Sequence, residues 1–77
     1  MQIFVASIEH SEGTNLYAAR SATELQRQLA IYCREEWSAI GLDGDPTTMR
    51  DKDVIDDYFE AMEGEESYHI ETVDLED

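Results

Sequence analysis

The chain has 77 residues, of which 42% are hydrophobic, and its formal net charge is −14 at pH 7. This length accommodates one domain with one core, residues 1–77, and the Trp, four Tyr and two Phe argue against disorder throughout. No apolar run approaches the roughly 20 residues of a membrane span, and the negative charge opposes direct binding to DNA or RNA.

The N-terminal residues predict a β-hairpin. Residues 2–9 and 14–20 are β-rich and apolar, and a short turn over residues 10–13 separates them. Gly13 can adopt a positive φ, which suits such a turn. We therefore expect two antiparallel strands at the start of the chain.

A helix is predicted over about residues 21–39. Ser21 and Glu24 have the spacing of a capping box, in which each side chain accepts a hydrogen bond from the other residue's backbone amide. Gly41 stands where a helix C-cap favours a left-handed residue. The apolar residues recur at steps of three and four: Leu25, Leu29, Tyr32, Cys33, Trp37 and Ile40.

The second half predicts a loop, a helix and a strand. Residues 41–49 contain glycine and proline and indicate the loop, and a helix then starts near Thr48 or Asp51 and ends before Gly64. The apolar stripe of this helix is Val54, Ile55, Tyr58, Phe59 and Met62. Residues 68–75 alternate as a strand does, and residues 76–77 are expected to fray.

The predicted order is β-β-α-α-β, which places the chain in the α+β class. Each element has one apolar side, so the economical arrangement packs both helices on one face of a three-stranded sheet. The pattern leaves open whether the last strand lies beside the first or the second.

The negative charge is concentrated in the second half of the chain. Residues 1–34 hold three Glu and three Arg, which cancel. Residues 35–77 hold the other 16 carboxylates against Arg50 and Lys52, so this segment carries the whole −14. Such asymmetry favours a surface with an interaction role over general solubility.

One face of the second predicted helix is strongly acidic. Like charges three or four residues apart destabilise a helix by about 0.2–0.5 kcal/mol per pair, so this face costs about 1–2 kcal/mol before screening. Its members are Asp53, Asp56, Asp57, Glu60 and Glu63, and Glu65, Glu66, Asp43 and Asp45 extend it. These nine residues are the candidate partner-binding site.

The spacing of these carboxylates suggests a mimic of nucleic acid. Five carboxylates over a helical rise of ~15 Å are about as closely spaced as the phosphates of one DNA strand. A protein that binds phosphates through Lys and Arg would then bind this face instead. A solvated acidic face that only keeps the chain soluble is the alternative.

Metal and catalytic sites have little support in the sequence. The segment from Asp43 resembles the opening of a calcium loop, but Thr48 and Val54 stand where an EF-hand needs Gly and Glu. His10, His69 and Cys33 form no zinc pattern and no nucleophile motif, and Cys33 alone forms no disulfide, which fits a reducing cytoplasm. We expect no cofactor and no enzymatic activity.

Two segments carry a resemblance to known small proteins. The hairpin reads IEHSEGTNLYAA and the helix reads YCREEW, and residues 3–37 resemble small proteins of phages and other mobile elements. In size and charge the chain is similar to anti-CRISPR proteins, several of which mimic DNA. This resemblance implies a CRISPR effector as partner, either a type I Cascade or a Cas9-like protein.

The sequence therefore predicts a non-catalytic inhibitor in the cytoplasm of a bacterial host. The expected partner is a basic nucleic-acid-binding protein, and the chain itself is expected to be a monomer or a weak homodimer. One alternative is an antitoxin-like or regulatory module that neutralises a basic protein. A divalent-ion buffer and a small enzyme are weaker alternatives.

Overall fold

The computed structural model describes residues 1–76 and shows the predicted order of elements. The strands and helices are β1 (Gln2–His10), β2 (Gly13–Ala19), α1 (Ala22–Glu36), the short 3-10 helix η1 (Pro46–Thr48), α2 (Asp51–Ala61) and β3 (Ser67–Asp74). The α+β class is confirmed. Of the two terminal residues expected to fray, Asp77 lies outside the described residues.

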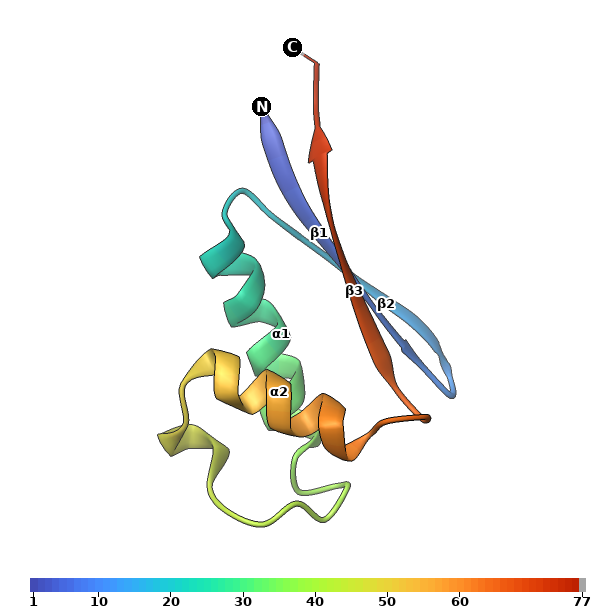
Figure 1. Cartoon of the computed structure of the whole chain (residues 1–77), viewed down its shortest axis with the longest axis vertical. Helices are drawn as coiled ribbons and strands as arrows, with labels where there is room; N and C mark the ends of the chain where they lie inside the picture. Colours follow the sequence, from blue (N-terminus) through green and yellow to red (C-terminus); the bar gives the residue numbers. More distant parts are fainter. Residues whose placement is uncertain (77) are drawn as a thin grey trace.

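The three strands form one antiparallel sheet in the order β2-β1-β3. The last strand therefore lies beside the first, which the sequence left open. Ser7 at the middle of β1 pairs with Leu16 on one side and with His69 on the other. Both helices lie on the same side of this sheet, and α2 crosses the C-terminal part of α1 (Figure 1).

The turn between β1 and β2 is formed by Ser11 and Glu12, because His10 pairs directly with Gly13. Gly13 has the positive φ that was predicted, 140°, but it begins β2 and does not lie inside the turn. The backbone amide of Glu12 donates to Nδ1 of His10 at 3.3 Å, and this bond closes the turn.

The N-terminus of α1 is capped, but by half of the predicted capping box. Ser21 Oγ accepts a hydrogen bond from the amide of Glu24 at 3.1 Å. The Glu24 carboxylate does not bond to the amide of Ser21 and instead binds Arg27, with Oε1 2.7 Å from Nη2. This ion pair also holds the pKa of Glu24 below its usual value.

The helix α1 ends earlier than predicted, with Trp37 as its C-cap, and Gly41 closes the turns that follow it instead of the helix itself. Glu36 is the last helical residue, and the chain continues through turns. The amide of Leu42 bonds to Trp37 O at 3.4 Å and that of Gly41 bonds to Ser38 O at 3.3 Å, which is the hydrogen-bond pattern of a Schellman motif. Gly41 supplies the positive φ of 76° that this motif requires.

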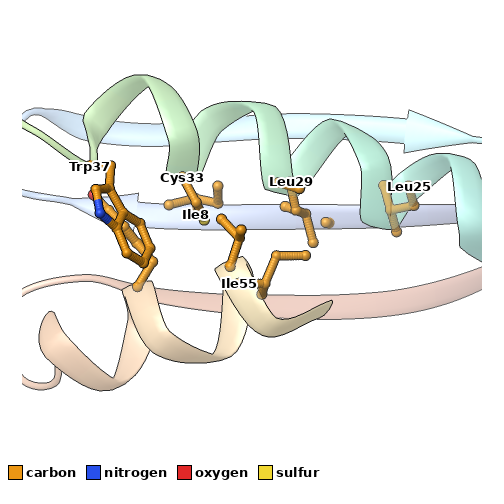
Figure 2. Packing of buried hydrophobic residues seen from close by; sticks show 10 residues of the cluster. Ile8, Leu25, Leu29, Cys33, Trp37 and Ile55 are labelled. Carbon is orange, nitrogen blue, oxygen red and sulfur yellow. The ribbon is translucent and has the colours of Figure 1, made fainter. Parts of the chain in front are cut away.

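One core lies between the sheet and the two helices. Leu25, Leu29, Cys33 and Trp37 follow one another along one side of α1 and meet Ile8, Ile55 and their neighbours (Figure 2). Full burial of a side chain such as leucine stabilises a fold by about 1.5–3 kcal/mol. The cluster comprises Ala6, Ile8, Leu25, Leu29, Ala30, Cys33, Trp37, Val54, Ile55 and Tyr58.

Arg34 fixes the loop that connects the two helices. Its guanidinium donates to Pro46 O at 3.0 Å, to Met49 O at 2.7 Å and to Asp51 Oδ1 at 2.8 Å. The side chain thus binds η1, the residue after it and the first turn of α2 at once. The loop is held to α1 at this point, and the position of α2 is fixed with it.

None of the helices within residues 1–76 is both long enough and apolar enough to span a membrane.

Candidate acidic interaction surface

The candidate surface is built on α2, whose buried side sets the direction of its carboxylates. Val54, Ile55 and Tyr58 point into the core, so the polar positions between them face outward. Asp51 and Asp53 lie in the first turn, where the helix dipole favours negative charge. Asp57 and Glu60 are exposed further along the helix, where that compensation is lost.

The row of regularly spaced carboxylates is shorter than the sequence predicted. The helix ends at Ala61, so Glu63 lies in the turn that follows, where its amide bonds to Glu60 O at 3.3 Å. The regular part runs from Asp53 to Glu60, a rise of about 10.5 Å at ~1.5 Å per residue. Four of the five carboxylates predicted for the acidic face, Asp53, Asp56, Asp57 and Glu60, are therefore on the helix itself.

Two of these four helical carboxylates are bound to cations. Asp53 lies 3.1 Å from Arg50, and Asp56 lies 3.0 Å from Lys52, whose pKa is raised by this hydrogen bond. Exposed pairs of this kind contribute little to stability, but they reduce the charge that a partner would meet.

The remaining helical carboxylates face a third one from the loop. Asp57 and Glu60 line a shallow depression together with Asp43, and Trp37, Leu42 and Ala61 complete its lining. Within residues 1–76, the carboxylates of Asp43, Asp57, Glu60 and Glu63 take part in no ion pair and no side-chain hydrogen bond. We call these four residues the acidic surface.

Asp45 has a structural role in the loop. Its Oδ1 accepts from the amide of Thr47 at 3.0 Å and from Thr47 Oγ1 at 2.6 Å, which caps η1. These two hydrogen bonds, the hydroxyl's first, hold the pKa of Asp45 below its usual value. The carboxylate therefore already has protein donors, unlike that of Asp43.

Glu66 also differs from the other candidates, because it is half-buried and bound by two tyrosines. Its Oε1 accepts hydrogen bonds from Tyr32 Oη at 2.7 Å and from Tyr58 Oη at 3.0 Å. Burial is the main cause that raises the pKa of both phenols, and the hydrogen bond to Glu66 raises both further. Glu66 ties the segment before β3 to α1 and α2.

Glu65 lies apart from the acidic surface, beside the hairpin of β1 and β2. It shares a depression with Glu9 and His10, while Glu12 and Glu36 line the neighbouring one. The sequence did not indicate this grouping, because the glutamates of the N-terminal half were balanced there against arginines. Only the antiparallel pairing of β3 with β1 brings residues 9 and 65 together.

The structure gives no metal centre among its described residues. Within residues 1–76, no group of three or more His, Cys, Asp or Glu side chains is placed to hold a metal ion. His10 Nε2 lies 3.3 Å from Asn15 Oδ1, and His69 is exposed with Nε2 3.1 Å from Glu71 Oε1. His69 therefore makes a contact at the surface with a carboxylate of its own strand.

Cys33 is completely buried in the core, as predicted from its place on the apolar side of α1. Burial raises the pKa of its thiol to about 12. The thiol therefore stays protonated at neutral pH, and nucleophilic chemistry requires the thiolate.

Comparison of the chain with protein-family models, with curated proteins and with solved structures finds no match.

Proposed function

We propose that this protein is a non-catalytic inhibitor whose acidic surface occupies a basic, nucleic-acid-binding groove of a partner protein. The observation that carries the proposal is the unpaired state of the acidic surface. Four of the five cationic side chains are bound to other carboxylates, namely Arg27, Arg34, Arg50 and Lys52. Asp57 and Glu60 are left exposed and uncompensated within the described residues.

Energetic cost supports a role for these two carboxylates. Asp57 and Glu60 are three residues apart on one helix and repel each other, and Glu60 also lies in the last turn, where the helix dipole disfavours negative charge. Asp43 adds a third charge at the same depression. A cationic groove would relieve this repulsion and release the counterions of both surfaces.

The partner that fits is a protein that grips phosphates with Lys and Arg. A CRISPR effector complex holds its target DNA in a positively charged channel, and it is the partner class that we propose, in the cytoplasm of a bacterial cell. The chain would then act stoichiometrically by excluding the nucleic acid.

Competition with DNA tests the proposal. The immobilised chain is used to capture its partner from a bacterial lysate, and the captured protein is then assayed for DNA binding with and without the chain. We expect the wild type to displace DNA. The double variant Asp57→Lys/Glu60→Lys should lose this activity, because two unpaired charges of the acidic surface are reversed.

The double variant Glu35→Lys/Glu76→Lys is the matched control. Each replacement changes the charge by two units, so both double variants carry −10 in place of −14. The control alters exposed carboxylates outside the acidic surface and should still displace DNA. Equal loss in both variants, or a captured partner that does not bind nucleic acid, would refute the proposal, and the latter would favour the antitoxin-like alternative.

A further inference from the structure

The outer edge of β3 is the free edge of the sheet nearest to α2. β3 pairs with β1 on one side and is the last strand of the order β2-β1-β3. Its register runs without interruption from Gln2↔Asp74 to Glu9↔Ser67, and the strand contains no proline, glycine or bulge. Natural proteins commonly use such features to keep a strand edge from pairing with another chain.

The backbone groups that point outward from β3 can be assigned. Leu75 N bonds to Met1 O at 2.7 Å, and the Met1 amino group bonds to Leu75 O at 3.1 Å, so these two residues form a hydrogen-bonded pair. Because such pairs alternate along an antiparallel ladder, the residues that bond to β1 are Val73, Glu71, His69 and Ser67. The N–H and C=O groups that face away from the sheet belong to Tyr68, Ile70, Thr72 and Asp74.

The opposite edge of the sheet, on β2, is partly covered by a side chain of α1. The same alternation leaves Ala18 of β2 pointing outward, and its carbonyl accepts a hydrogen bond from Gln28 Nε2 of α1 at 3.2 Å. Within residues 1–76, no side chain bonds to the backbone of residues 67–74. The edge of β3 is therefore the more accessible one.

An apolar groove lies beside this edge. Tyr68 and Ile70 face the helices but are 38% and 46% exposed, because α1 packs over β1 and β2 rather than over β3. The groove has a volume of about 230 Å³ and is lined by Phe4, Leu25, Leu29, Ile55, Tyr68 and Ile70. Lys52 and Asp56, already paired with each other, stand at its rim.

The charges around the edge indicate what it would accept. Glu71 and Asp74 lie on β3; Glu71 contacts His69, and Asp74 takes part in no ion pair within residues 1–76, whereas Asp56 at the rim of the groove is paired with Lys52. In the antiparallel pairing of two copies that is centred on Glu71 and joins the whole strand, the two Glu71 carboxylates would face each other, so like charge opposes this self-pairing. A cationic strand is favoured instead.

We propose that β3 binds an extended segment of a partner protein with alternating apolar and basic side chains, which adds to the sheet as a fourth strand. The segment bonds to the outward backbone groups of Tyr68, Ile70, Thr72 and Asp74. Its apolar side chains enter the groove beside Ile70, and its basic side chains lie on the other face near Glu71. This site does not depend on the acidic surface or on the inhibitor function proposed above.

A synthetic peptide of alternating valine and lysine, matched to the 8 residues of β3, is the probe. Titration of the isotope-labelled full chain, followed by NMR, should show saturable binding that shifts the amides of Tyr68, Ile70, Thr72 and Asp74. Thr72→Pro removes an outward amide without disturbing the bonds to β1, and it should weaken binding about tenfold or more. Thr72→Val keeps the amide and should bind as the wild type does.

A peptide with glutamate in place of lysine should not bind. Ile70→Asn, which makes the groove polar, is the second weakening variant and replaces Thr72→Pro if that chain does not fold. The proposal is overturned if the lysine peptide does not saturate, if both weakening variants bind it unchanged, or if the shifts are confined to α2. If the chain binds no peptide but self-associates, and Thr72→Pro abolishes the self-association, the proposal is also overturned, and the edge of β3 then pairs with a second copy of the chain.

Discussion

Glu66 joins three elements of the fold through one oxygen. Two phenols, Tyr32 Oη on α1 and Tyr58 Oη on α2, donate to its Oε1 just before β3 begins. Tyr58 is completely buried, so its hydroxyl has no water to replace a lost acceptor. Glu66, which the sequence predicted as an extension of the acidic face, therefore holds α1, α2 and the start of β3 together.

Replacing Glu66 should accordingly cost stability. We expect Glu66→Ala to lower the free energy of unfolding by about 2–3 kcal/mol, because hydrogen bonds to a charged acceptor are lost and a buried hydroxyl is left unpaired. Glu66→Gln keeps an acceptor oxygen and should cost less than half of this. Urea denaturation measures both, and equal stability of Glu66→Ala and wild type would contradict the assigned role.

The chemistry of individual residues was only partly predictable. The apolar spacing correctly placed Cys33 and Trp37 on the inner side of the first helix, where both are buried. The indole Nε1 of Trp37 has no hydrogen-bond partner among the described residues. Asp45 and Glu66 could not be separated from Asp43 by sequence, because their donors come from local turn geometry and from distant tyrosines.

At the scale of elements, the sequence predicted those features that depend on hydrogen bonds between residues close together in the chain. Ser21 and Gly41 mark the two ends of the first helical region because a cap is made by groups within a few residues. The pairing of β3 with β1 joins residues more than 50 positions apart, and hydrophobic alternation does not choose between two strand edges. The hairpin-end group around Glu9 and Glu65 was missed for the same reason.

The two ends of α2 should respond oppositely to loss of a charge. Glu60→Gln removes an unpaired carboxylate from the last turn and should raise the free energy of unfolding by about 0.3–1 kcal/mol. Asp53→Asn removes a carboxylate from the first turn that is paired with Arg50, and it should lower stability by a similar amount.

Urea denaturation at low ionic strength measures this difference, and high salt should shrink both effects by screening. A destabilising Glu60→Gln would show that this carboxylate makes a favourable interaction, and the energetic case for an interaction role would then fail. The Asp53 variant controls for a general effect of removing one charge from the helix.

At the scale of the whole molecule, the fold separates two kinds of surface. The acidic surface lies on α2, the loop before it and the turn after it, near the end of the molecule remote from the N-terminus (Figure 1). The apolar groove and the free edge lie along β3. The two contacts that we propose therefore use different surfaces of one small domain.

The salt dependence of partner affinity tests the central claim most directly. For the captured partner, the affinity of the wild-type chain is measured between about 50 and 500 mM salt, the range over which contacts of the phosphate type weaken sharply. We predict a steep linear fall of log affinity with log salt concentration, and a shallower slope for Asp57→Lys/Glu60→Lys than for Glu35→Lys/Glu76→Lys. A wild-type affinity that stays constant across this range would contradict the account.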